Sequence, residues 1–142
     1  MDKLEGPDTD KQVSLTGKTV ILDLPYNQAA AACYVLNGLA PVLWLVTEPP
    51  ANRTLRYHSI QALALFVAVA VVNVLLGTIG AVVGWMPLIG QVIGLVIALA
   101  QGVAAMAYLG VCIQLILRVY KGNPGRLPVI SEHIDKYLDS AN

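Results

Sequence analysis

Apolar residues dominate the middle of the chain and leave room for three membrane-crossing helices. Residues 57–117 contain no Asp, Glu, Lys or Arg, and a domain surrounded by water could not solvate so long an uncharged stretch. A second uncharged run lies upstream, with its apolar core at residues 29–46. A crossing helix needs about 20 apolar residues. We therefore predict an all-α, polytopic integral membrane protein with three transmembrane helices.

Turn-forming residues set the boundaries of these helices. The predicted spans are residues 28–46, 60–83 and 88–119. Pro49 and Pro50 end the first span, because the residue before a proline avoids the helical region. The segment GWMPLIG, residues 84–90, forms the turn between the second and third spans. Pro41 lies inside the first span and is expected to kink it.

Polar segments flank this membrane domain, which covers residues 28–120. Residues 1–27 form a polar N-terminal tail, and residues 121–142 form a second tail. Ser131 can cap a short amphipathic helix in the second tail. One face of that helix would carry Ile130, Ile134, Tyr137 and Leu138. This helix could lie on the membrane surface, dock against residues 47–59, or belong to a solvated tail.

Basic residues near the spans predict the orientation of the protein. They are Arg53, Arg56, Arg118, Lys121 and Arg126. Lys and Arg concentrate in cytoplasmic loops, and three spans would bring both basic segments to that side. A fourth span would separate them. We therefore expect an outer N-terminus and a cytoplasmic C-terminus.

The first residues, MDKLEGPDTD, indicate the cellular address. They are acidic and polar, with no apolar core of the kind that a signal peptide carries. They are also unlike a transit peptide, which is rich in Arg and Ser and poor in acidic residues. We expect the bacterial cytoplasmic (inner) membrane.

Three amides lie near the middle of the predicted spans, namely Asn37, Asn73 and Gln101. Hydrocarbon cannot satisfy an amide, so such side chains hydrogen-bond across helices, with about 0.6–2 kcal/mol for each bond. We expect this structural role. A polar path for a substrate is the alternative.

Small residues repeat every four positions along the third span, as Gly90, Gly94, Ala98 and Gly102. Such a row allows two helix backbones to approach closely. The row could pack against the other spans of the same chain, or against a second copy or another membrane subunit.

Catalytic patterns are missing from the sequence. It contains no HExxH motif, no P-loop, no Ser-His-Asp set and no carboxylate within residues 57–117. Cys33 and Cys112 each stand alone in an apolar stretch, where a small buried residue is the expected role. The three-span arrangement places Cys33 near the outer surface and Cys112 near the inner one. Lys and Arg total 9, as do Asp and Glu, which does not favour nucleic-acid binding. We expect neither an enzyme nor a bound metal or cofactor.

Two segments carry a resemblance to a known family. They are CYVLNGLAPVLWLVTEPP (residues 33–50) and NRTLRYHSIQALALF (residues 52–66), followed by residues 119–122 and 127–130 in the tail. Together they resemble a widespread family of small bacterial membrane proteins. That family is similar to the small channel-type subunit of the chloroplast inner-envelope protein translocon. Those plastid proteins are drawn with four spans, whereas the charges here favour three.

The resemblance implies a family signature at the membrane surface, at the start of the second span. Its residues are Arg53, Arg56, Tyr57, His58 and Gln61. Arg56 and Tyr57 would anchor the span at the headgroups, His58 would have a structural or lipid-contacting role, and Gln61 would satisfy free amides at the helix start.

Two functions fit this sequence. The first is a protein-translocon-like channel component that acts through helix–helix assembly, which the resemblance favours. The second is a non-catalytic structural or assembly subunit of a larger membrane complex. Both imply contact with the lipid bilayer, and with further copies of the chain or other membrane subunits.

Overall fold

The computed structural model describes residues 17–123 and 127–140, which form five helices and no strand. The helices are α1 (Tyr26–Val35), α2 (Leu39–Thr47), α3 (Arg53–Val83), α4 (Ile89–Tyr120) and α5 (Pro128–Ser140). The prediction of an all-α protein is therefore confirmed for these residues.

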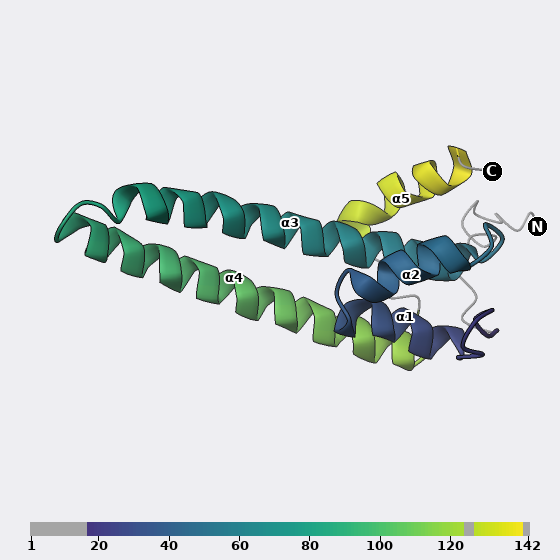
Figure 1. The fold of residues 1–142 in the computed structure, drawn as a ribbon. Coiled ribbons are helices and arrows are strands. Elements are labelled where there is room, and N and C mark those ends of the chain that lie inside the picture. The colour runs from purple at the N-terminus through teal and green to yellow at the C-terminus, as the bar shows by residue number, and fades with distance from the viewer. Residues whose placement is uncertain (1–16, 124–126, 141–142) are drawn as a thin grey trace, which may run out of the picture.

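The two longest helices, α3 and α4, run antiparallel and extend from one end of the molecule to the other (Figure 1). They contain 31 and 32 residues, and both are long and apolar enough to cross a membrane. Their most apolar windows are only 6% and 0% buried, unlike a core helix of a soluble protein. The turn that joins them follows Val83, as the GWMPLIG segment predicts.

The first predicted span is wrong as a continuous helix. The chain reverses at residues 36–38, so that α1 and α2 form a helical hairpin, and neither helix alone is long enough to cross a membrane. Gly38 has a φ of +77°, a conformation that glycine adopts without strain. Pro41 lies in the first turn of α2, where its missing N–H would have no intrahelical partner. Among the described residues, two helices are therefore long and apolar enough to cross a membrane, instead of the predicted three.

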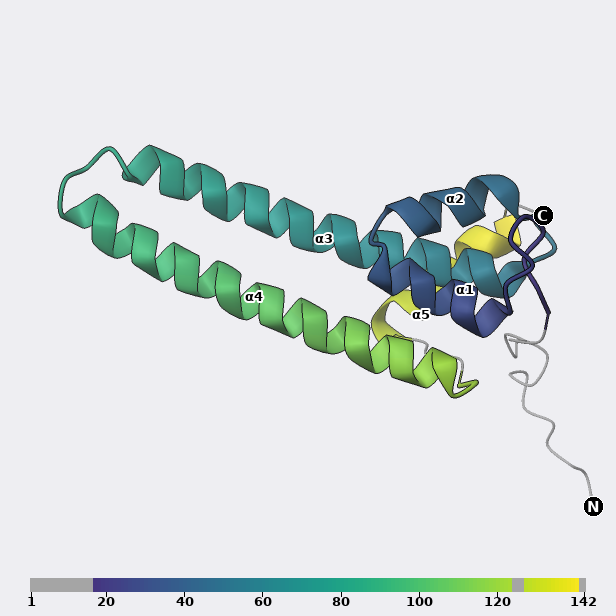
Figure 2. The same cartoon turned by 60° about the horizontal axis from the view of Figure 1, so that its bottom comes forward.

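The α1–α2 hairpin packs against one end of the α3–α4 pair (Figure 2). At the open end of this hairpin, Tyr26 Oη donates to Asn52 Oδ1 at 2.9 Å, which joins the start of α1 to the start of α3. At its tip, a Cβ placed on Gly38 would lie 3.7 Å from the Phe66 ring of α3. The hairpin therefore reaches only part of the way along α3.

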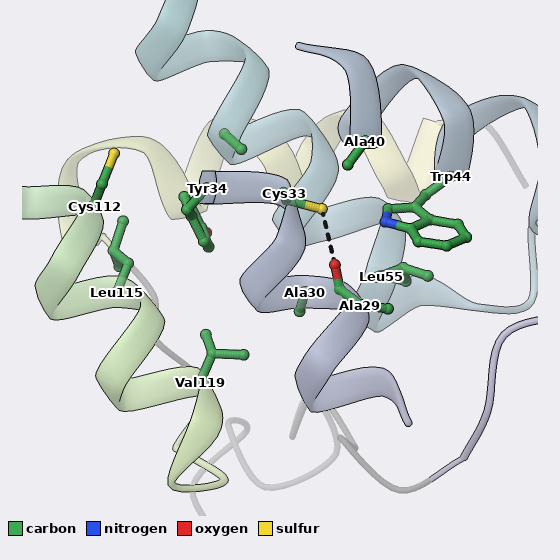
Figure 3. Close-up of a cluster of buried hydrophobic side chains, with 11 residues drawn as sticks. Ala29, Ala30, Cys33, Tyr34, Ala40, Trp44, Leu55, Cys112, Leu115 and Val119 are labelled. Carbon is green, nitrogen blue, oxygen red and sulfur yellow. Dashed lines mark hydrogen bonds between the residues drawn. The ribbon is translucent and has the colours of Figure 1, made fainter. Parts of the chain in front are cut away.

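This packing divides the molecule into two regions. We call α1, α2, α5, residues 53–62 of α3 and residues 112–120 of α4 the base, and the remainder of α3 and α4 with its turn the arm. The main apolar cluster lies in the base (Figure 3). Its buried members are Ala29, Ala30, Cys33, Tyr34, Ala40, Trp44, Leu55, Ala62, Cys112, Leu115 and Val119.

The two cysteines are free and buried in this one cluster. Burial agrees with their expected role. Their expected separation to opposite membrane surfaces is wrong, because α1 turns back and brings Cys33 to the same end as Cys112. The segment that leads into α1 and the helix α5 also lie at the base end (Figure 1), so an outer N-terminal tail no longer follows from the path of the chain.

The predicted C-terminal helix is confirmed as α5, and it docks on the start of α3. Ile134 and Leu138 are buried against Tyr57, with Ile60 beside them. Of the other two residues of the predicted face, Ile130 packs against this cluster, whereas Tyr137 is 60% exposed. On the solvent side, Lys136 donates to Glu132 at 3.0 Å, and this hydrogen bond lowers the pKa of the Glu132 carboxyl.

Candidate functional site

Polar side chains are concentrated in the interior of the base. His58, Ser59 and Gln61 have no exposed surface. They lie in the first three turns of α3, and after Ala62 this helix has no buried residue. They point into the base because α1 and α5 cover this part of α3. Buried polar groups are costly unless hydrogen-bonded, so their partners define the site.

The Tyr34 hydroxyl joins two of these side chains to α1. Gln61 Nε2 donates to Tyr34 Oη at 3.0 Å, and Tyr34 Oη lies 3.1 Å from His58 Nδ1. Because the hydroxyl carries one hydrogen and two lone pairs, it can accept from Gln61 and still either donate to or accept from Nδ1. The tautomer of His58 decides which of the two groups donates. The trio therefore fastens α1 to α3 by directional bonds inside an apolar cluster.

Two further contacts surround the trio. The Tyr57 ring meets the His58 ring edge-on, with centroids 5.7 Å apart and an interplanar angle of 88°. Cys33 Sγ lies 3.6 Å from Ser59 Oγ. All of these side chains are enclosed by protein, so a solute could reach them only if the base opened.

Three members of the family signature differ from their expected surface position. Arg53 and Arg56 are partly exposed, and Arg53 forms an ion pair with Asp139 of α5. Tyr57, His58 and Gln61 are buried, because α1 and α5 pack on the face of α3 that carries them. Gln61 does not serve the helix start either, since α3 begins at Arg53 and the Gln61 amide donates to Tyr34.

A second polar network closes the open end of the base. The buried Glu48 carboxylate accepts the backbone N–H of Val20 at 2.8 Å and the side-chain amide of Asn52. Asn52 in turn accepts from Tyr26. This network ties residues 17–25, the end of α2 and the start of α3 to one carboxylate.

The three predicted intramembrane amides lie at separate positions. Asn37, at the tip of the α1–α2 hairpin, accepts a 2.6 Å hydrogen bond from Tyr108 Oη. Asn73 donates to Val69 O on its own helix. Gln101 donates across the arm to the backbone oxygen of Asn73 at 3.3 Å. Asn37 and Gln101 thus bond between elements, as the structural interpretation expects, and the three do not line one path within the chain.

The four small residues predicted to share one face of α4 have different surroundings. Gly90 is buried, and a Cβ there would lie 2.6 Å from the carbonyl oxygen of Val83. A Cβ on Gly94 or Gly102 would meet nothing within 4 Å. Gly102 instead lies in a shallow apolar groove on the surface of α4. The groove is lined by Ala98, Leu99, Gly102, Val103, Met106 and Ala107.

Sequence reasoning missed Tyr34 and Glu48. The one signal for Glu48 was its position, since it is the sole carboxylate between Asp23 and Glu132. Tyr34 gave no local signal, because its partners are more than 20 residues away.

Within residues 17–123 and 127–140, His, Cys, Asp and Glu do not gather in a group of three that could hold a metal ion. The expectation that the protein has no cofactor stays a prediction.

Comparisons with known proteins returned no relative: no family model matches this chain, and neither a curated protein nor a solved structure matches it.

Proposed function

We propose that the chain is an integral membrane protein of the bacterial inner membrane and a subunit of an oligomeric, translocon-like channel assembled through α4. The observation that carries this proposal is the low burial of the apolar residues on the arm. Only 6% and 0% of the most apolar windows of its two helices are buried, and an apolar surface of this kind is stable where lipid or another apolar helix covers it.

A channel requires several copies of this chain. Two antiparallel helices enclose no lumen, and the amides of Asn37, Asn73 and Gln101 are engaged at separate places. The open groove around Gly102 supports the assembly, because small residues let a second helix approach closely. The basic residues at the base would face the cytoplasm.

A second candidate is a structural subunit present once in a larger membrane complex. The apolar lining of the α4 groove favours this candidate, since its six lining residues provide no polar side chain for a conducting path. The same groove would then hold a helix of a different protein.

One pair of variants tests both candidates. Gly102→Leu fills the groove, whereas Ala100→Leu adds the same side chain to the opposite side of α4, about 200° around the helix. Each protein is purified in a mild detergent, sized, analysed for stoichiometric partners, and reconstituted into liposomes for conductance measurements.

The channel proposal expects a homo-oligomer that conducts ions or peptides, and that Gly102→Leu dissociates while Ala100→Leu does not. A single copy bound at fixed stoichiometry to one larger partner, again lost only in Gly102→Leu, would select the structural candidate. Assembly that survives Gly102→Leu would show that the groove is not the contact.

A further inference from the structure

The outward side of the α1–α2 hairpin, between Val35 and Val46, presents an unusual surface for part of the packed base. Six large apolar side chains on it are between 43% and 79% exposed. They are Val35, Leu36, Leu39, Val42, Leu43 and Val46. No charged residue interrupts them, since residues 24–47 are uncharged. This surface continues the apolar surface of the arm, because the tip touches Phe66 and Tyr108.

The position of the tip along both long helices gives its depth. On α3, ten residues separate Arg56 from Phe66, and on α4 ten residues separate Tyr108 from Arg118. At about 1.5 Å per residue, each separation is about 15 Å. The hydrocarbon core of a bilayer is about 30 Å thick. If the two arginines mark the membrane surface, the tip lies near the middle of the bilayer.

Three backbone N–H groups in and beside the turn at the tip are hydrogen-bonded within the protein. Irregular backbone at membrane depth must find hydrogen bonds within the protein. Leu36 N donates to Ala32 O at 2.9 Å, Leu39 N to Leu36 O at 3.1 Å, and Val42 N to Gly38 O at 3.2 Å. The Asn37 side-chain oxygen accepts from Tyr108.

We propose that α1 and α2 form a re-entrant hairpin that enters the leaflet next to the basic residues, is covered there by lipid acyl chains, and leaves on the side from which it entered. Residues 17–25 then lie on the same side of the membrane as residues 121–123 and α5. This inference rests on the membrane insertion proposed above and adds the path of the chain within the bilayer.

Cysteines added one at a time to the full-length protein, beside the two native ones, test the sidedness. Lys18→Cys, Lys121→Cys and Trp85→Cys are treated with a membrane-impermeant maleimide, in right-side-out and in inside-out vesicles. The unsubstituted protein measures background from the two buried native cysteines. We expect Lys18→Cys and Lys121→Cys to label in one vesicle type and Trp85→Cys in the other. Labelling of Lys18→Cys together with Trp85→Cys would mean that the first segment crosses the bilayer, and would overturn the inference.

A nitroxide on Leu36→Cys tests the depth, with Lys121→Cys as the surface control. We expect Leu36→Cys to be relaxed strongly by oxygen, which dissolves in hydrocarbon, and weakly by a water-soluble nickel chelate. The opposite order at Leu36 would overturn the lipid contact. Failure of membrane insertion itself would give a different result, because carbonate would then extract the protein and all three maleimide sites, Lys121→Cys included, would label in the same vesicle type.

Discussion

The base and the arm share two helices but bury them very differently. At the start of α3, in the base, Leu55, His58, Ser59 and Gln61 are completely buried. Beyond Ala62 no residue of the same helix is buried, and the most apolar window of α4 has no buried residue either. Hydrophobicity rises along α3 in the direction in which burial falls. In a protein dissolved in water these two properties would rise together.

This contrast shows where each region obtains its stability. The base holds itself together by packing and buried hydrogen bonds between helices far apart in sequence. The arm has one seam between two helices, where Ile97 packs near Gly80 and Gln101 near Gly77, and none of the described residues covers its outer apolar surface. Changes in the base should therefore affect folding in any solvent, and changes on the arm surface should affect assembly.

The largest expected effect on stability comes from truncating a leucine in the base, compared with the same truncation in the arm. Leu55→Ala removes a side chain with no exposed surface, and Leu75→Ala removes one that is 59% exposed. Truncating a buried leucine leaves a cavity and costs about 2–5 kcal/mol, whereas an exposed one costs within about 0.5 kcal/mol. Thermal unfolding in detergent measures both. Equal losses would mean that the base is not a separate packed core.

A second comparison concerns glycines of the arm that look equivalent in sequence. A Cβ on Gly90 would strike the Val83 carbonyl oxygen, while one on Gly94 meets open space. We expect Gly90→Ala to destabilise the protein by about 1–3 kcal/mol through backbone displacement. Gly94→Ala should stabilise it by up to about 1 kcal/mol through helix propensity. Changes of opposite sign in the free energy of unfolding would confirm that the two glycines have different surroundings. A decrease in both variants would contradict it.

The hydrogen-bonded trio gives a third test. Tyr34→Phe deletes the hydroxyl between Gln61 and His58 and deprives two buried groups of that bond. The expected cost is about 1–3 kcal/mol. Tyr120→Phe is the control, because Tyr120 is 63% exposed. Similar unfolding midpoints for the two variants would indicate that the trio contributes no net stability.

The sequence predicted the long helices well, because their signals are local. The uncharged stretch before Arg118 required apolar helices, and the turn after Val83 was visible in its glycines and Pro87. The amphipathic period of residues 130–138 likewise identified α5.

The first segment could not be predicted in the same way. Pro41 predicted a kink within one continuous helix, whereas the chain reverses completely at residues 36–38, just before Pro41. Composition cannot distinguish these cases, since the residues are apolar in both. The Tyr26–Asn52 and Asn37–Tyr108 bonds distinguish them, and such long-range contacts leave no pattern along a single sequence. For the same reason the burial of His58 beneath Tyr34 was missed.

The smallest expected effect lies at the surface of the base, where α5 is attached. Arg53 and Asp139 form an ion pair whose side chains are 41% and 49% exposed, and such pairs contribute about 0–1 kcal/mol. Asp139→Asn should therefore lower stability by less than about 1 kcal/mol, and added salt should reduce the difference from the parent protein. Leu138→Ala, which opens the apolar contact beneath this pair, should cost more and should respond little to salt. Unfolding at low and high salt compares the two. If Asp139→Asn had the larger effect, charge would attach α5 to α3; the burial of Ile134 and Leu138 against Tyr57 indicates that apolar packing does so instead.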